Sequence, residues 1–451
     1  MIKFHSTNYN TPDVDFKTAV LRGQALDKGL YMLNKIPTLD HQEIFSFKDL
    51  SLQEIAFEIL TKIFKEQIPE KSLKNIIHSA LNFEIGLEKI EQFDYLCHLS
   101  KGPTCSFKDF GARVLARIME YFLSLEEKEI IILTATSGDT GGAVAQAFYE
   151  MSRIKVIVLY PKNEISELQR KQMTTLGKNV IAIGINGKFD DCQKIIKTAF
   201  ADTDLQDYNL SSANSINVGR LIPQTIYYFW SYSRIIQHLN EKVIFSVPSG
   251  NFGNLTAGII ASKMELPVDK FISAVNENDE FPRFLSSGIY NKIVPSRNCL
   301  SSAMNVGNPS NLARIFDLYG GQIDENGNIQ RNPDLEKLRS IIKSYSISDK
   351  LTKETIEGFY NKYEKIIEPH GAVGWAALQI YRTKNPSQND IKSITFETAD
   401  PAKFPEQIIS LIKKKPKLPR TLEIIQNKKE YQNPIEINKY EDFKLFIQNN
   451  I

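Results

Sequence analysis

Apolar and polar positions in the middle of the chain alternate in a way typical of β-strands separated by α-helices. Apolar runs of strand length lie at residues 130–133, 155–159 and 180–185. Segments of helix length follow them, at residues 141–149, 166–176 and 189–200, and Gly177 is placed to cap the second of these helices. Strands separated by helices of about ten residues predict βαβ units and a parallel sheet.

The same alternation returns in the second half of the chain. Strands are predicted at residues 243–247, 271–275 and 394–396, with a helix from residue 255 and mainly helical structure over 334–382. Residues 1–80 read instead as a mixed, mostly helical lead-in, where Ser51 and Glu54 have the spacing of a capping box. Ligands of parallel sheets bind at the carboxyl ends of the strands, so the loops there are the places to look for chemistry.

Composition and charge narrow the class of protein. The chain has 451 residues, 42% of them hydrophobic and 24% charged, as in an ordinary globular protein. Its formal net charge of +2 does not suggest nucleic-acid binding, and Lys413–Lys415 is interpreted as a solvated face. The first residues lack a signal peptide's apolar region, and no apolar run approaches the ~20 residues of a membrane span. We therefore expect a cytoplasmic protein without a membrane partner.

The cysteines predict neither a disulfide framework nor a metal site. The chain has four, too few for such a framework at this length, and their spacing fits no zinc site: Cys97, Cys105, Cys192 and Cys299. We expect no metal ion, and Cys105 is interpreted as a packing residue.

The first candidate segment, Gly102 to Gly111, places Lys108 just before an apolar helix at residues 113–123. A helix dipole disfavours a cation at this end. Lys108 should therefore lose its proton readily, as an amine that forms a Schiff base must. Asp109 is expected to cap the helix that follows. Taken alone, the segment equally fits a surface lysine in a turn.

The second segment, Thr134 to Gly142, follows a predicted buried strand and opens a helix. Its hydroxyls, small residues and free N–H groups favour an anion site that would suit a substrate carboxylate. The alternative is a plain N-cap formed by Ser137 or Asp139, although capping alone does not require so many small residues.

Two more loops complete the set. Ser249 to Thr256 joins a strand to a helix, and its two glycines allow a phosphate to approach the backbone, although it matches neither a Walker A motif nor a complete G-x-G-x-x-G. Thr398 to Phe404 follows the last predicted strand and alone indicates only a turn before a helix. A lysine, a carboxylate-type loop and a phosphate-type loop on one α/β scaffold together suggest pyridoxal phosphate as the cofactor.

In this order the four segments resemble the threonine synthase family, within the fold type II group of pyridoxal-phosphate enzymes. The resemblance runs from Gly29–Tyr31 to about residue 410, and it also takes in Ser211–Asn217, Val247–Pro248, Ser302–Asn311 and Glu368–Ala372. It implies two parallel-sheet α/β domains with the cofactor between them. We predict a lead-in at residues 1–85, a smaller domain with the cofactor lysine at 86–215, and a larger domain with the phosphate loop at 216–451.

The resemblance also implies a role for individual residues. Lys108 would carry the cofactor and act as general base and acid, the Gly250–Asn254 loop would hold the cofactor phosphate, and Thr398 would bond the pyridine nitrogen. The implied cofactor-binding residues are Lys108, Gly250, Asn251, Phe252, Gly253, Asn254 and Thr398. The implied substrate-binding residues are Thr136, Ser137, Gly138, Asp139 and Thr140 for the carboxylate, with Asn214 and Arg220 for the substrate's phosphate.

Three side chains in these segments admit another interpretation. A carboxylate at Asp139 would repel that of the substrate, so we expect it to cap the helix or to bond Thr140. Arg220 has the bidentate geometry that phosphate favours, and its alternative is a surface charge near a helix start. His370 is interpreted as structural rather than catalytic.

The implied reaction converts O-phospho-L-homoserine and water into L-threonine and phosphate, the last step of threonine biosynthesis, by a lyase that acts as a monomer or homodimer. A serine/threonine dehydratase or a cysteine synthase is the nearest alternative, and neither needs a second phosphate site. A catalytically inactive homologue with a binding role is a further alternative, and the presence of Lys108 and of the whole phosphate loop counts against it.

Overall fold

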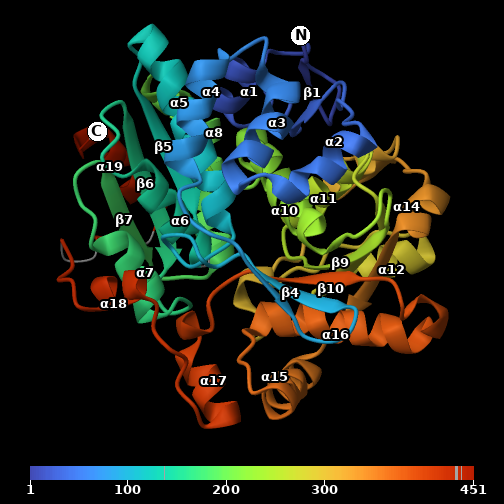
Figure 1. Cartoon of the computed structure of the whole chain (residues 1–451). Coiled ribbons are helices and arrows are strands. Elements are labelled where there is room, and N and C mark those ends of the chain that lie inside the picture. The colour runs from blue at the N-terminus through green and yellow to red at the C-terminus, as the bar shows by residue number, and fades with distance from the viewer. Residues whose placement is uncertain (137, 432–434, 438, 451) are drawn as a thin grey trace.

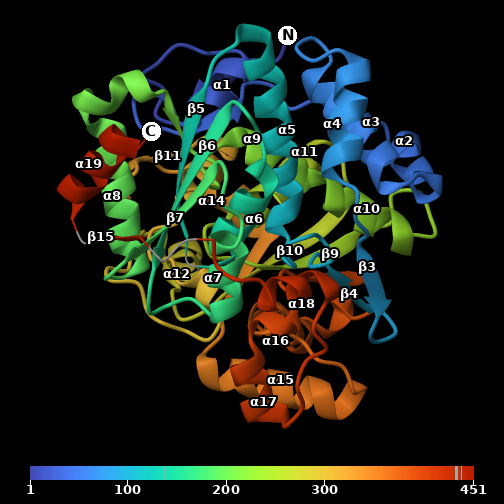
Figure 2. The ribbon, with the colours of Figure 1, turned by 90° about the vertical axis from the view of Figure 1, so that its left-hand side faces the viewer.

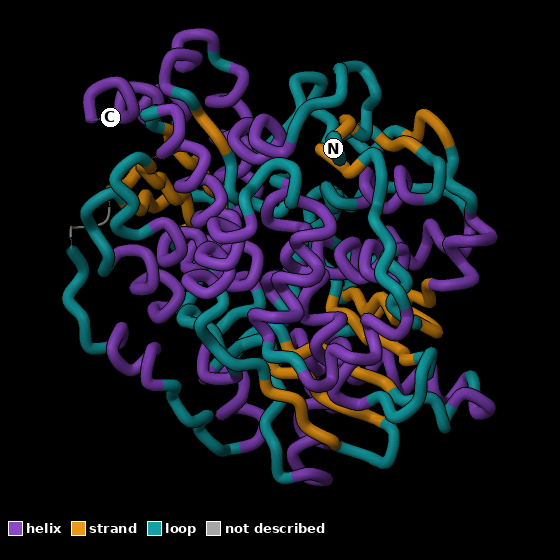
Figure 3. Tube along the Cα trace, turned by 45° about the horizontal axis from the view of Figure 1, so that its top comes forward, coloured by secondary structure: helices purple, strands orange, loops and turns teal. Residues whose placement is uncertain are grey.

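The computed structural model describes residues 1–136, 138–431, 435–437 and 439–450. Two parallel-rich sheets stand side by side, the smaller at the left of Figure 1 and the larger at the lower right, with the N-terminal helices above them. Figure 3 shows helices surrounding both groups of strands, with the two chain ends on the same upper side. The predicted α/β class with two sheet-centred halves is confirmed.

The smaller sheet has the strand order β15-β7-β6-β5-β8, and its paired strands are all parallel. These strands span β5 (Ile130–Ala135), β6 (Ile154–Pro161), β7 (Val180–Ile185), β8 (Leu210–Ser211) and β15 (Ile435–Ile437). The helices around it are α5 (Lys108–Glu126), α6 (Asp139–Phe148), α7 (Glu167–Thr174), α8 (Phe189–Ala201) and α19 (Tyr440–Asn450). Helices α8 and α19 cover one face, where Phe443 and Ile447 join the core formed by Ile131, Leu133 and Ile157.

The larger sheet has the order β13-β10-β9-β14-β4-β3 and is parallel except for β3, which pairs antiparallel with β4. Its strands span β3 (Gly86–Lys89), β4 (Asp94–His98), β9 (Val243–Pro248), β10 (Val268–Val275), β13 (Ile342–Ser346) and β14 (Ser393–Glu397). One face packs against α16 (Pro369–Lys384) through residues such as Val373 and Ala377, with α15 (Asp349–Tyr363) beyond it. The other face meets α11 (Gly253–Lys263) and α10 (Ile226–Ile235), whose Tyr228 ring packs against Phe245 and Phe396 of the sheet.

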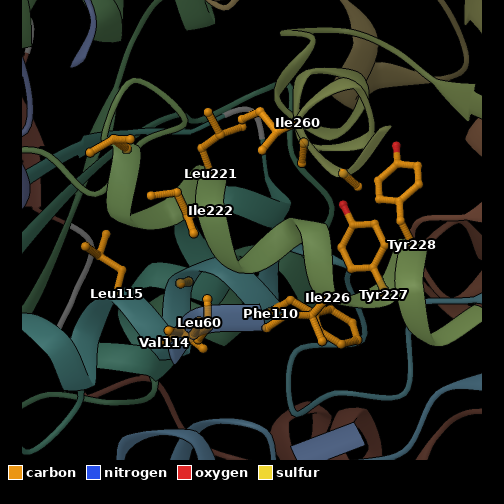
Figure 4. Packing of buried hydrophobic residues seen from close by; sticks show 14 of the residues in the cluster. Leu60, Phe110, Val114, Leu115, Leu221, Ile222, Ile226, Tyr227, Tyr228 and Ile260 are labelled. Carbon is orange, nitrogen blue, oxygen red and sulfur yellow. The ribbon is translucent and has the colours of Figure 1, made fainter. Parts of the chain in front are cut away.

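The lead-in packs onto α5 and α10 and shares their core. It consists of β1 (Phe4–Ser6), α1 (Phe16–Arg22), β2 (Tyr31–Leu33), α2 (His41–Ser46), α3 (Leu52–Phe64) and α4 (Glu70–Ala80). The capping box predicted at the start of α3 is confirmed, because the Ser51 hydroxyl accepts from the N–H of Glu54 and the Glu54 carboxylate accepts from the N–H of Ser51. Figure 4 shows the shared core, where Leu60 of α3 lies beside Phe110 and Val114 of α5.

The remaining elements connect the two halves or lie at their edges. They are α9 (Val218–Leu221), α12 (Glu280–Ser287), α13 (Leu312–Leu318), β11 (Gln322–Ile323), β12 (Ile329–Arg331), α14 (Leu335–Ile341), α17 (Pro405–Ile412) and α18 (Arg420–Gln426). Short 3-10 turns complete the path at 47–49, 203–208, 222–225, 302–304, 386–388 and 401–403.

Strand β13 was not predicted, and helix α7 ends earlier than predicted. Strand β13 interrupts the region 334–382, which was predicted to be mainly helical, because residues 342–346 pair with β10 at the sheet edge. Helix α7 ends at Thr174, two residues before the predicted end, although Gly177 does adopt the expected positive φ of 69°. Both differences arise from tertiary pairing or local turn geometry that the hydrophobic pattern does not encode.

The predicted domain boundaries stay a prediction. The chain passes between the halves more than once. Strands β3 and β4, from the predicted smaller domain, belong to the larger sheet, whereas β15 and α19 return to the smaller half from the C-terminal region. Figure 2 shows β15 and α19 beside β7 and α8.

Candidate active site

A cavity of about 810 Å³ lies at the carboxyl ends of β5 and β9, where the predicted loops meet. Its walls include Ala135 and Pro248, the last residues of those two strands. Most of the predicted site residues line it: Lys108, Asp139, Thr140, Asn214, Arg220, Gly250, Asn251, Phe252, Gly253, Asn254 and Thr398. Thr136 and Gly138 lie behind this lining, and Ser137 is outside the described residues.

Lys108 is the first residue of α5, and its side chain is only 12% exposed. The pKa of its amine is lowered to about 8, chiefly by burial; the positive charges of Arg220 and Lys403 act in the same direction, whereas Asp139 opposes them. The Lys108 Nζ atom lies 3.7 Å from Asp139 Oδ2. The expected easy deprotonation is thus explained chiefly by burial, which disfavours the charged form.

Asp109 does not cap the helix, so that prediction was wrong. It lies within the first turn of α5, and its carboxylate accepts hydrogen bonds from the backbone N–H and the hydroxyl of Thr104, at 2.9 and 2.7 Å. A Cβ atom on Gly102 would lie 2.4 Å from Asp109 Oδ2, so glycine is required there. These contacts fold the loop that presents Lys108 to the cavity.

The loop after β9 is built around neutral donors. Phe252 adopts a left-handed conformation with φ of 60°, and α11 begins at Gly253, directing its unpaired first N–H groups toward the loop. Asn254 Oδ1 accepts hydrogen bonds from the hydroxyls of Tyr227 and Tyr228, at 2.8 and 2.7 Å. Figure 4 shows these hydroxyls pointing to the same side. The Asn254 Nδ2 atom is left buried without a partner, as a donor for a ligand.

The rest of this loop fits a phosphate group. Asn251 is held by its Nδ2 atom, which donates to Ser215 Oγ at 2.6 Å, and by its Oδ1 atom, which accepts from the N–H of Ser310 at 2.6 Å. A Cβ on Gly253 would make only ordinary van der Waals contacts, the nearest at 3.6 Å, and Gly253 lines the cavity at the helix N-terminus. A helix N-terminus that borders a cavity and carries an unpaired amide donor suits an anion.

Thr136 organises the loop after β5. Its hydroxyl accepts hydrogen bonds from the N–H groups of Gly138 and Gly141, at 2.9 and 2.7 Å. Gly138 has a φ of 129° and lies against the Gln169 side chain, which approaches the position of a Cβ to 2.5 Å. Thr136 and Gly138 therefore shape the loop from behind, while Asp139 and Thr140 face the cavity.

The expected role of Asp139 as a helix cap or a partner of Thr140 was wrong. Its Oδ1 atom pairs with Lys403 Nζ at 2.6 Å and accepts from Gln169 Nε2 at 3.1 Å. Although burial raises the pKa of Asp139, the charges of Lys403 and Lys108 outweigh it and hold the pKa well below its usual range. Lys403 was missed because its segment, read alone, indicated only a turn.

Arg220 and Asn214 both line the cavity. Arg220 is buried, so the alternative of a surface charge is excluded, and its Nη1 donates to the carbonyl of Ala213 at 2.7 Å. Burial lowers the Arg220 pKa to about 10, and its Nε atom has no partner. Asn214 donates to the carbonyl of Ala135 at 3.2 Å, while its Oδ1 atom is also buried and unpartnered. A buried guanidinium with free donors suits an anionic ligand.

Thr398 is held by Glu368, a buried residue whose role the sequence did not indicate. Glu368 accepts from the Thr398 backbone N–H at 3.3 Å and lies 3.5 Å from its hydroxyl. The same carboxylate lies 2.5 Å from His370 Nδ1, and His370 Nε2 accepts from the N–H of Ala303 at 3.1 Å. Both ring nitrogens of His370 are thus occupied by protein groups, in agreement with a structural role.

Burial raises the pKa of the Cys105 thiol to about 11, and its sulfur lies 3.4 Å from the Thr421 hydroxyl. This environment suits the packing role expected for Cys105. Across the described ranges, no three or more His, Cys, Asp or Glu side chains are grouped to hold a metal ion. In the same ranges, no helix is both long enough and apolar enough to span a membrane.

Family models match three successive parts of the chain. A model described as threonine synthase N terminus matches residues 3–81, one described as pyridoxal-phosphate dependent enzyme matches 95–394, and one described as threonine synthase, C-terminal, matches 371–447. The chain is 38% identical to the threonine synthase of Buchnera aphidicola subsp. Acyrthosiphon pisum over 426 residues, 94% of each chain.

The chain belongs to the threonine synthase family. It is 38% identical to the family member from Haemophilus influenzae, over 94% of each chain. Its structure matches threonine synthase from yeast with a TM-score of 0.90 and 32% identity, over 99% of this chain and 98% of the other. It also matches the pyridoxal-phosphate-bound threonine synthase from Brucella melitensis, with a TM-score of 0.90 and 30% identity over 99% of each chain.

Membership of the threonine synthase family confirms the predicted fold, cofactor and enzyme class: the chain is a pyridoxal-phosphate-dependent lyase. A more distant likeness, to maize serine racemase with a TM-score of 0.52 and 14% identity, shows only that the fold is shared.

Proposed function

We propose that this member of the threonine synthase family converts O-phospho-L-homoserine and water into L-threonine and inorganic phosphate, with pyridoxal phosphate carried on Lys108. The observation that supports this most strongly is a single cavity that holds an amine with a lowered pKa and two separate anion sites. The neutral loop after β9, the buried Arg220 and Lys108 all line this cavity. One anion site suits the cofactor phosphate and the other suits a phosphate on the substrate.

The residues present fit the cofactor. The unpartnered Asn254 Nδ2 atom and the first N–H groups of α11 would hold its phosphate, in the part of the cavity lined by Gly250, Asn251, Phe252 and Gly253. Thr398 would bond the pyridine nitrogen, held in place by Glu368. When bound, the cofactor supplies an electron sink that stabilises negative charge on the substrate carbon next to the amine.

The substrate is proposed to bind through both of its anionic groups. The loop with Thr136, Ser137, Gly138, Asp139 and Thr140 would receive the carboxylate through N–H and hydroxyl groups. Arg220 and Asn214 would hold the phosphate, which places the substrate's Cα near Lys108. Fixing both ends of the substrate lowers the entropic cost of bringing the reacting atoms together.

Lys108 is proposed to perform the proton transfers. Its amine, with a pKa of about 8, is partly neutral near neutral pH and takes the proton from Cα and then one from Cβ. The bond between Cγ and the phosphate oxygen breaks, water adds its oxygen at Cβ, and protons return to Cγ and Cα. The atoms balance, since one water is consumed and one phosphate is released for each threonine formed.

The direct test is an assay of phosphate release from O-phospho-L-homoserine by purified protein with added pyridoxal phosphate. Threonine is measured in the same tube, and Lys108→Ala is the control. We expect equal amounts of phosphate and threonine, with both lost in the control. Cofactor binding without phosphate release would contradict the proposed substrate and would direct the assay to dehydratase and cysteine-synthase substrates.

Arg220 separates this proposal from those alternatives, which need no second phosphate site. Arg220→Ala should raise the KM for phosphohomoserine by about 10- to 100-fold, since a hydrogen bond to a charged group contributes about 1.5–3 kcal/mol. Arg170→Ala, which removes an arginine paired with Glu430 outside the cavity, is the matched control and should leave the KM unchanged. An unchanged KM in Arg220→Ala would contradict the substrate assignment.

The proposal also covers the cellular location and the assembly state of the enzyme. We infer that it acts in the cytoplasm, in keeping with four buried cysteines that form no disulfide, and as a monomer or homodimer without nucleic-acid partners. Sedimentation of the purified protein tests the assembly state.

A further inference from the structure

A second lysine, Lys403, lies behind the cavity, completely buried. Its Nζ atom lies 2.6 Å from Asp139 Oδ1 and 3.0 Å from the carbonyl oxygen of Thr104. It therefore joins the loop after β14 to the loop before α5 and to the start of α6. A cation that is out of contact with solvent is costly unless it is paired, so this contact must be a strong constraint on Asp139.

The two oxygens of Asp139 have different surroundings. Oδ1 is occupied by Lys403 and by Gln169 Nε2, whereas Oδ2 faces the Lys108 amine at 3.7 Å, beyond hydrogen-bonding distance. One carboxylate thus lies between two lysines and is bound closely to only one of them. Without Lys403, Asp139 would be free to pair with Lys108 and to retain a proton on its amine.

The charged groups around Lys108 influence the pKa of its amine. Arg220 and Lys403 act to lower the pKa of Lys108, and Asp139 and Glu368 act to raise it. His370 also faces Asp139, and Asp109 faces both Arg220 and Lys403. Among these groups, Lys403 both disfavours a positive charge on Lys108 and forms an ion pair with Asp139, the carboxylate nearest to Lys108.

We propose that Lys403 is a positioning residue of this active site: it holds the Asp139 carboxylate in an ion pair and so leaves the Lys108 amine free to lose its proton. The same pair neutralises the carboxylate that would otherwise repel the substrate's own. The inference rests on the proposed function, because it assumes that Lys108 carries the cofactor.

The test follows the return of pyridoxal phosphate to the full-length protein after the cofactor has been stripped from the holoenzyme. The rate at which the visible absorbance band reappears is measured as a function of pH, because imine formation requires an uncharged amine. In Lys403→Met the midpoint of this profile should move up by about one pH unit or more. Binding at pH 7 should then be roughly 10-fold slower for each pH unit by which the midpoint rises. At pH 10 the two rates should converge.

The dependence of the holoenzyme's kcat on pH is a second profile. Its acid limb should also move to higher pH in Lys403→Met. Lys403→Arg, which keeps the charge, should restore the wild-type midpoint. Lys403→Gln removes the charge but can donate to the same oxygens, and it takes the place of Lys403→Met if that variant does not fold. Lys392→Met is the matched control, because Lys392 is another largely buried lysine, paired with Glu241 at 2.8 Å away from the cavity, and it should leave both profiles unchanged.

A midpoint within about 0.3 pH units of wild type in Lys403→Met and Lys403→Gln would overturn the inference, and so would a uniform slowing at every pH, since either indicates a purely structural role. These results differ from a failure of the proposed function. In that case Lys108→Ala would still develop the visible band, or wild-type protein would bind the cofactor without releasing phosphate.

Discussion

The two strand-to-helix loops that face the cavity are built on opposite principles. The loop after β9 uses backbone N–H groups, a glycine and an asparagine amide oriented by two tyrosine hydroxyls. The loop after β5 contains a buried carboxylate, Asp139, and requires a buried lysine to balance it. A neutral loop can hold a permanently resident anion without a pH-dependent charge of its own. The charged loop instead ties the shape of the substrate site to the protonation of Lys108.

Removing the charge of Asp139 from the loop after β5 should have the largest effect on the stability of the protein. Asp139→Ala leaves Lys403 as an unpaired buried cation and should lower the free energy of unfolding by about 3–5 kcal/mol. Asn254→Ala, in the neutral loop, should cost about 1–2 kcal/mol. Urea denaturation of the cofactor-free protein measures both. The double variant Asp139→Ala, Lys403→Met should recover much of the lost stability. Equal losses in Asp139→Ala and Asn254→Ala would contradict the proposed difference between the two loops.

Lys108, which lies beside the charged loop, should make the stability of the protein depend on pH because it is buried. Its pKa in the folded protein is about 8 against an ordinary value of 10.5, so between these values the unfolded chain binds more protons and stability rises with pH. Below pH 8 burial of the charge costs about 3 kcal/mol, and above pH 10.5 the cost disappears.

Lys108→Met should therefore be more stable than the wild-type apoprotein by up to about 3 kcal/mol at pH 7, and this difference should vanish by pH 10.5. Urea denaturation at several pH values checks the trend. Asn254→Ala is the control, because its stability difference from wild type should not change with pH. A constant difference for Lys108→Met would show that the lysine keeps its ordinary pKa.

A smaller effect is expected from the tyrosines behind the neutral loop. Tyr228→Phe removes one of the two hydroxyls that orient the Asn254 amide, and should weaken pyridoxal phosphate binding about 5-fold, corresponding to about 1 kcal/mol. Tyr232→Phe is the control, because its hydroxyl donates to the carbonyl of Glu241 instead. Cofactor titration of both variants measures the change. An unaltered affinity in Tyr228→Phe would contradict a role of the tyrosine hydroxyls in orienting Asn254 for the cofactor.

The smallest effect on stability should come from Gly253→Ala. The added methyl group meets only ordinary contacts and reduces the freedom of the unfolded chain, so stability should rise by about 0.5 kcal/mol. The methyl group would also occupy the space proposed for the cofactor phosphate, so cofactor affinity should fall. We expect thermal melting to show a higher melting temperature and cofactor titration to show a lower affinity for pyridoxal phosphate. Unchanged affinity would place the phosphate elsewhere.

The sequence predicted those parts of the site that depend on local pattern. Apolar runs and loop composition located the strands ending at Ala135 and Pro248, and the loops after them meet at one cavity. Strand β13 was missed because its pairing at the sheet edge is a long-range contact. The return of the C-terminal helix α19 to the smaller half was missed for the same kind of reason.

The errors within the site share one physical cause. The roles of Asp109 and Asp139 were assigned from their neighbours in sequence, as helix caps, whereas their partners are set by the folding of loops. Thr104 lies five residues before Asp109, and Lys403 is far from Asp139 in sequence. Glu368 was not singled out for the same reason, since its bond to Thr398 forms only when β14 and α16 pack together. Burial and partner choice are tertiary properties that a local motif does not carry.

The Nζ atoms of Lys108 and Lys403 lie 3.7 and 2.6 Å from the Asp139 carboxylate. The most direct test therefore identifies which of the two lysines carries the cofactor. The holoenzyme is reduced with borohydride and digested, and the modified lysine is located by mass spectrometry. We expect a single reduced pyridoxyl group on the peptide containing Lys108. A label on Lys403, or on any other lysine in place of Lys108, would contradict it.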